Sequence, residues 1–149
     1  MIEGDMSYDK DFISSINDIE DVQALPEDLG YIDQLKKNFP IEVNRIAWPR
    51  VMEYCYKKIK ISDISVAKTE VLQFLDRIKV WADIDGSQKV IVISDGALEK
   101  SYQMSFSSFE AIFDKIFFLP QHTYVVPVNL SWCINYTFED DLYFGLSLS

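Results

Sequence analysis

The side chain best suited to acid–base chemistry near neutral pH is His122, the single histidine of the chain. In a pair with Cys55 or Cys133, His122 would act as the general base and the cysteine as the nucleophile. The local sequence does not favour this pairing, because Cys133 lies within an expected strand and not at a sharp turn or a helix start. We therefore interpret His122 as a structural or surface residue, and both cysteines as thiols buried in a reducing compartment.

Metal and phosphate chemistry lack their usual motifs. A zinc site needs four ligands, usually at short spacings, whereas the sequence offers one histidine and two widely separated cysteines. No glycine-rich phosphate-binding motif and no nucleophile-elbow motif is present. We expect no catalytic constellation, metal or cofactor, although distant carboxylates that meet in the fold remain an open alternative.

The densest run of acidic residues, 139–141, lies between two expected strands. It lacks the glycine and the terminal glutamate of an EF-hand loop. It is either a solvated turn or a contact site for lysine and arginine side chains of a partner. Together with a neighbouring tyrosine and the aspartates of other turns, the candidate partner-binding residues are Glu139, Asp140, Asp141, Tyr143, Asp83, Asp85 and Asp95.

The net charge of −10 limits the range of partners. An acidic surface repels phosphates, which argues against direct nucleic-acid binding, and it attracts cationic proteins. Residues 117–145 contain no lysine or arginine, so their end is expected to be a bare anionic tip. The alternative is that the surplus of acid only keeps the protein soluble.

The size and composition are typical of one domain spanning 1–149. Residues 1–28 are acidic, and they form either a loosely packed segment or a short amphipathic helix between Phe12 and Ile19. The apolar runs are far shorter than the ~20 residues of a membrane span, and the N-terminus lacks the apolar core of a secretory signal. We expect a cytoplasmic protein.

Four further helices are predicted. One runs from Leu29 to Asn38, with Asp28 as its cap, and one begins at Trp48-Pro49 because proline is tolerated in a first helical turn. The second of these has an apolar stripe of Val51, Met52, Cys55, Tyr56 and Ile59. A longer helix extends from about Ser65 to Val80. The last begins with Ser107 as N-cap and Glu110 three positions later, and ends before Pro120.

The strands are expected mainly in the last third of the chain. The segments with β-branched or alternating residues are Lys89–Ser94, His122–Val126, Trp132–Phe138 and Leu142–Leu148. Turns at Asp85-Gly86 and Asp95-Gly96 flank the first of them. Trp132, Ile134, Tyr136 and Phe138 share one strand face and are expected in the core. The sequence therefore predicts an α+β fold, with N-terminal helices followed by an antiparallel sheet of about four strands that ends in a C-terminal meander.

The C-terminal pattern HxYxxPxxxSWCxNYTxEDDLYFG, from His122 to Gly145, resembles bacterial toxin-immunity proteins of the contact-dependent growth inhibition or polymorphic-toxin type. The resemblance covers only this stretch, and its motif consists mostly of apolar and turn residues. It implies a cytoplasmic, non-catalytic protein that binds one cognate toxin domain.

The resemblance and the charge together predict an inhibitor of a cationic, nuclease-like toxin. A small adaptor or structural protein without a toxin partner is the alternative. An enzyme that uses scattered carboxylates with His122 is a further alternative.

Overall fold

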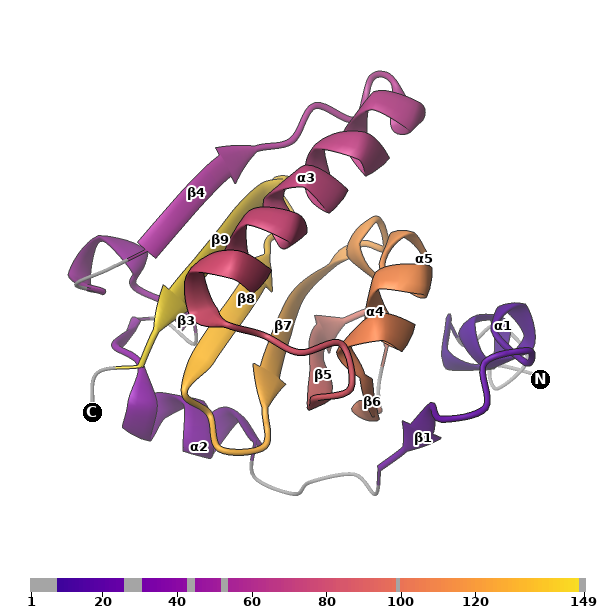
Figure 1. The fold of residues 1–149 in the computed structure, drawn as a ribbon, viewed down its shortest axis with the longest axis horizontal. Helices are drawn as coiled ribbons and strands as arrows, with labels where there is room; N and C mark the ends of the chain where they lie inside the picture. The colour runs from indigo at the N-terminus through magenta and orange to yellow at the C-terminus, as the bar shows by residue number, and fades with distance from the viewer. Residues whose placement is uncertain (1–7, 26–30, 43–44, 52–53, 99, 148–149) are drawn as a thin grey trace.

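The computed structural model describes residues 8–25, 31–42, 45–51, 54–98 and 100–147, and its centre is a seven-stranded antiparallel sheet (Figure 1). The strands are β1 (Gln23–Ala24), β4 (Tyr54–Lys58), β5 (Lys89–Gly96), β6 (Tyr102–Ser105), β7 (Gln121–Pro127), β8 (Trp132–Tyr136) and β9 (Asp141–Leu146). Their spatial order is β1-β6-β5-β7-β8-β9-β4, so the expected C-terminal meander of β7, β8 and β9 is confirmed.

The α+β class is confirmed, but the predicted number of strands and the predicted order of elements are wrong. The sheet has seven strands and not about four, and helices are interspersed among the strands. The helices are α1 (Tyr8–Ser15), α2 (Tyr31–Asn38), α3 (Ile64–Ala82), α4 (Phe106–Ile112) and α5 (Asp114–Phe117). A separate hairpin pairs β2 (Ile41–Glu42) with β3 (Arg45–Ile46), and Trp48–Arg50 form a 3-10 turn, η2.

Apolar side chains cover both faces of the sheet. Val125 and Ile134 pack with α3, α4 and α5 in one core, whereas Val126 and Cys133 belong to a second core with Leu35 of α2 and Trp48 of η2. Successive residues of a strand point to opposite faces, so β7 and β8 are buried along their whole length. These central strands form a rigid support for the turns at their ends.

The long helix predicted from Ser65 to Val80 is confirmed as α3. The Asp63 side chain caps its start by accepting a hydrogen bond from the Val66 amide at 3.3 Å. The predicted apolar stripe is buried on the sheet, and the helix ends at Asp83, whose φ of 54° is left-handed. The helix crosses the sheet on the same side as α4 and α5 (Figure 1).

The helix predicted to begin at Trp48-Pro49 is wrong. The chain forms only the short turn η2 and then the edge strand β4, which pairs with β9. Tyr54, Tyr56 and Lys58 are exposed on one face of β4, whereas Cys55 and Lys57 are half-buried on the other. The alternating pattern of a strand therefore describes this segment better than the apolar stripe of a helix. Met52, one residue of that stripe, lies outside the described residues.

Two local predictions also need correction. Helix α4 begins two residues earlier than predicted, because Ser105 rather than Ser107 is the N-cap and accepts a 3.1 Å hydrogen bond from the Ser108 amide. Asp95-Gly96 is not a turn but the end of β5. The turn at Asp85-Gly86 is confirmed by the hydrogen bond from the Gln88 amide to the Asp85 carbonyl.

The described part of the N-terminal segment packs against the sheet. Phe12 and Ile16 are buried in the α3-side core, and the Asp9 carboxylate accepts a hydrogen bond from the buried Tyr102 hydroxyl. Asp21 accepts hydrogen bonds from the Ser105 amide at 3.0 Å and the Ser108 hydroxyl at 2.5 Å. The short helix expected between Phe12 and Ile19 is found only in part, because α1 begins at Tyr8 and ends at Ser15. The predicted cap Asp28 lies outside the described residues. Among the described helices, none has the length and apolar character needed to cross a bilayer.

Candidate partner-binding site

The sheet brings Asp95 close to the acidic turn at 139–141. Asp95 is paired with His122 across β5 and β7, and His122 Nδ1 accepts a hydrogen bond from the Phe138 amide at 3.2 Å. Neighbouring strands lie about 4.8 Å apart, so Asp95 and the turn between β8 and β9 share one end of the sheet. We call the residues Asp95, Phe138, Glu139, Asp140 and Asp141 the acidic strand-end.

Hydrogen bonds hold the acidic turn in one conformation. Asp140 has a left-handed φ of 67°, and its amide donates to the Thr137 carbonyl at 3.0 Å. The Thr137 amide donates to the Asp141 carbonyl, and the Tyr136 hydroxyl donates to Asp140 Oδ1 at 2.7 Å. The Asp140 carboxylate is therefore engaged within the fold, and hydrogen bonds within the chain order the turn.

The turn is not the bare anionic tip that its own sequence predicts. The Nζ atom of Lys58, in β4, lies 3.4 Å from Asp141 Oδ1. It also donates a hydrogen bond to the Glu139 carbonyl at 2.6 Å. The Tyr56 hydroxyl donates to the same Asp141 oxygen at 2.7 Å, which raises the pKa of Tyr56 to about 12. Two residues of β4, a strand distant in sequence, thus contact the Asp141 carboxylate, and Lys58 balances its charge. Asp95 and Glu139 are the two exposed carboxylates of the acidic strand-end.

Phe138 is the functional candidate that the sequence analysis missed. It was expected in the core with Trp132, Ile134 and Tyr136, which are indeed buried, but its own side chain is 57% exposed. Strand β8 ends at Tyr136, so the alternation of faces stops before Phe138. A large exposed ring beside two carboxylates is a feature of partner-binding surfaces, where aromatic side chains are enriched.

Tyr143 lies outside the acidic strand-end and is half-buried. Its ring stacks on Trp48, with centroids 5.0 Å apart and planes inclined by 4°. Tyr54 and Tyr56 contact the Tyr143 ring from β4 and are themselves 41% and 50% exposed. The exposed aromatic surface on this face is therefore formed by β4, whereas Tyr143 mainly supports it.

Asp83 and Asp85 lie at the opposite end of the sheet from Asp95. The segment of β5 from Lys89 to Asp95 spans roughly 20 Å, which separates the two groups of aspartates. Asp83 terminates α3, and Asp85 Oδ1 accepts a hydrogen bond from the Ser87 amide at 3.0 Å. The fold therefore brings together Asp95 and residues 139–141, but neither Asp83 nor Asp85 joins them.

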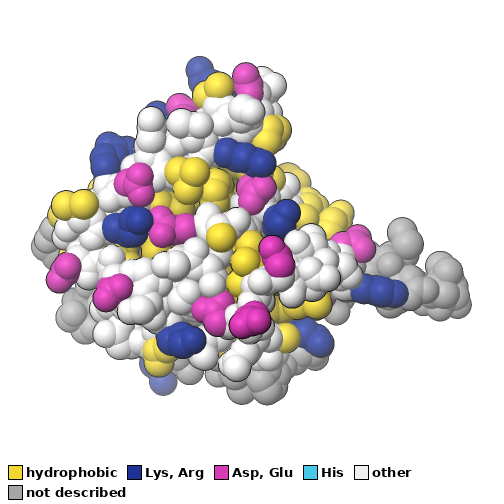
Figure 2. Space-filling view, turned by 45° about the vertical axis from the view of Figure 1, so that its right-hand side comes forward, with side chains coloured by type: hydrophobic (Ala, Val, Ile, Leu, Met, Phe, Trp, Pro, Cys, Tyr) yellow, Lys and Arg dark blue, Asp and Glu magenta, His cyan; other side chains and the backbone are white. Residues whose placement is uncertain are grey.

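Charged groups of both signs lie on the face shown in Figure 2. Acidic and basic side chains alternate there, with hydrophobic side chains between them. Oppositely charged side chains of the protein also form ion pairs, such as that between Lys79 Nζ and Glu110 Oε2 at 2.9 Å. The net charge of −10 therefore does not form one continuous acidic surface on this face.

The histidine and the cysteines show no sign of an activated nucleophile. Burial raises the pKa of the Cys133 thiol, and it also raises the pKa of the half-buried Cys55 thiol. His122 is buried and contacts the Phe138 amide. Within the described residues, no group of three or more His, Cys, Asp or Glu side chains is arranged to hold a metal ion.

Comparison of the whole sequence with known proteins adds no family to this description. No model of a known protein family matches the chain, and no curated protein sequence matches it significantly.

Proposed function

We propose that this protein is an immunity-type inhibitor that binds and neutralises a cationic, nuclease-like toxin domain in the bacterial cytoplasm. The acidic strand-end is the contact surface in this proposal. The toxin's basic residues meet Asp95 and Glu139, and an apolar residue of the toxin covers Phe138. The resemblance of residues 122–145 to toxin-immunity proteins supports the choice of partner.

The observation that carries the proposal is the exposed Phe138 ring on a turn that hydrogen bonds hold rigid. A preorganised aromatic side chain loses little conformational entropy on binding, and few interface residues usually supply most of the affinity. Fully desolvated charge pairs next to such a residue can couple by ~1.5–7 kcal/mol. Rim pairs would contribute much less.

The test begins with co-purification of the chain with the product of the gene that directly precedes its own, since immunity genes follow their toxin genes. Binding is then measured with Phe138→Ser, which should weaken the affinity at least about tenfold, or ~1.4 kcal/mol. The matched control is Val128→Ser, because Val128 is 63% exposed in the turn at the other end of β7 and β8. Failure of the two proteins to associate, or equal effects of the two substitutions, would contradict the proposal.

A further inference from the structure

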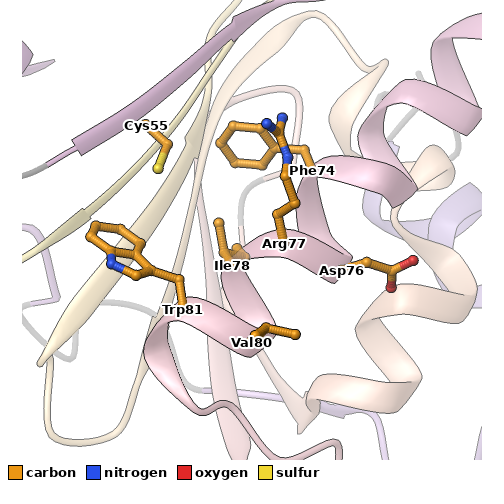
Figure 3. Close-up of a pocket in the computed structure, with 7 residues that line it drawn as sticks. All are labelled: Cys55, Phe74, Asp76, Arg77, Ile78, Val80 and Trp81. Atoms are coloured by element: carbon orange, nitrogen blue, oxygen red, sulfur yellow. The ribbon is translucent and has the colours of Figure 1, made fainter.

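A groove lies between α3 and the edge strand β4, on the opposite face of the sheet from Tyr54 and Tyr56. It has a volume of about 660 Å³. Its lining residues are Cys55, Phe74, Asp76, Arg77, Ile78, Val80 and Trp81. In Figure 3, Cys55 of β4 faces Phe74 and Trp81 of α3 across the groove, whereas the Asp76 carboxylate points away. The surface offered to an occupant is therefore mainly apolar.

The groove opens beside an edge of the sheet that no other described strand covers. Strand β4 is the last strand in the sheet order and pairs only with β9. The Ile59 amide donates to the Asp140 carbonyl at 2.9 Å, so the odd-numbered residues of β4 direct their backbone groups toward β9. The amides and carbonyls of Tyr54, Tyr56 and Lys58 consequently point outward, and they can pair with an added strand.

Arg77 supplies the charge at this groove. Its guanidinium lies over the Phe74 ring, with Cζ 5.9 Å from the ring centroid. Among the described residues, no carboxylate lies within ion-pair distance of Arg77, whereas the neighbouring Lys57 is paired with Glu70 at 3.3 Å. An arginine that forms no ion pair within the described part of the chain, beside an apolar groove, is complementary to a ligand that carries both an apolar group and a carboxylate.

We propose that the free edge of β4 and this groove form a docking site for an extended segment of a partner protein. The segment pairs with β4 as an eighth strand, places an apolar side chain between Cys55 and Trp81, and brings a carboxylate to Arg77. Added strands bind in this way because backbone hydrogen bonds give affinity and alternate side chains give specificity. This site goes beyond the proposed function and uses a different surface.

The probes are two acetylated and amidated peptides of one composition. Thr-Leu-Thr-Glu-Thr places Leu and Glu on the same side of a strand, so both reach the groove side. Thr-Thr-Leu-Glu-Thr places them on opposite sides and serves as the control. Each peptide is titrated into the full chain, and binding is followed by the amide shifts of β4 and the indole shift of Trp81. The same titrations are made with Arg77→Gln, whose exposed position leaves the fold intact.

The alternating peptide should shift the amides of Tyr54, Tyr56 and Lys58 and bind at least about threefold more tightly than the control. Arg77→Gln should weaken the alternating peptide by about threefold to fivefold, as expected for one partly exposed ion pair. Equal binding of the two peptides, or no shifts in β4, would overturn the proposal. A concentration-dependent dimer that shifts the β4 amides would also overturn it, because the occupant would then be a second copy of the chain.

Discussion

Tyr56 and Asp141 are diagonal neighbours on strands β4 and β9, and the Tyr56 hydroxyl donates a 2.7 Å hydrogen bond to Asp141 Oδ1. Lys58 lies 3.4 Å from the same oxygen. This relationship connects the edge strand to the acidic turn and places Asp141 in contacts within the chain. Asp95 and Glu139 are the exposed carboxylates of the acidic strand-end, and the proposed binding surface therefore depends on them.

The hydrogen bond to Asp141 should be measurable through the titration of Tyr56. It raises the pKa of this phenol from 10.0 to about 12 because it favours the protonated form. The stability that Tyr56 contributes is therefore fully present below pH 10 and is lost as the pH rises toward 12. In Asp141→Asn, carbon-13 NMR of labelled tyrosine should show the pKa of Tyr56 moving back toward 10. Asp85→Asn is the control, and a pKa of Tyr56 that is the same in both variants would contradict this.

Asp21 should make the stability of the chain depend on acidic pH. Although partial burial opposes the shift, hydrogen bonds from Ser108 and Ser105 lower the pKa of Asp21 from its ordinary 3.8. The stabilisation is present above that value and is lost as the pH falls through the lower pKa of the folded state. In urea unfolding at pH 7, Asp21→Ala should lower the free energy of unfolding by about 1–2 kcal/mol. This difference from the unsubstituted chain should become smaller below about pH 4. The exposed Asp18→Ala is the control, and an equal loss for Asp18 would show that the hydrogen bonds contribute nothing.

The second core depends on a buried polar contact between Trp48 and Asn135. Trp48 Nε1 donates to Asn135 Oδ1 at 3.0 Å, and Asn135 Nδ2 donates to the Thr123 carbonyl at 2.9 Å. Asn135→Ala leaves the buried Trp48 Nε1 without its acceptor and removes one hydrogen bond to the Thr123 carbonyl, so it should lower the free energy of unfolding by about 1–3 kcal/mol. A double-mutant cycle with Trp48→Phe should give a coupling of at least about 1 kcal/mol. Additive losses would mean that this hydrogen bond does not attach η2 to the sheet.

Gly96 should be required for the end of β5, where Asp95 lies. Its φ is 145°, and an added Cβ would lie 2.9 Å from the Gln121 Cβ and 3.0 Å from the Pro120 carbonyl oxygen. Gly96→Ala should therefore destabilise the chain by about 1–3 kcal/mol. Gly86→Ala is the comparison, because its Cβ meets only the movable Ser107 side chain. If thermal unfolding showed a smaller loss of stability for Gly96→Ala than for Gly86→Ala, the requirement for glycine at position 96 would be contradicted.

The sequence was sufficient for elements whose pattern is long and unambiguous. The stripe from Ala67 to Ile78 predicted α3, and the β-branched run after Lys89 predicted β5. Strand β4 was missed because Cys55 and Ile59 fit a helical stripe, while Tyr54, Tyr56 and Lys58 fit a strand. In so short a segment, pairing with β9 decides the structure, and pairing between distant segments cannot be read from local spacing.

The candidate site was predictable only in its local part. Residues 139–141 are adjacent in sequence and form one turn, whereas Asp95 joins them through the register of β5 with β7. Lys58 and Tyr56 reach Asp141 through the unpredicted strand β4. The exposure of Phe138 depends on where β8 ends, and strand ends are set by the hydrogen bonds of the turn rather than by the alternation of residues.

The most direct test of the proposed function compares two double variants that remove the same charge from opposite ends of the sheet. In 0.1 M salt, where screening acts over about 10 Å, Asp95→Asn with Glu139→Gln should weaken binding of the co-purified toxin by at least about tenfold. Asp83→Asn with Asp85→Asn, roughly 20 Å away along β5, should change it by less than about twofold. Equal effects of the two double variants, or toxin binding that is unchanged between about 0.1 M and 1 M salt, would contradict the assignment of the acidic strand-end as the toxin-binding surface.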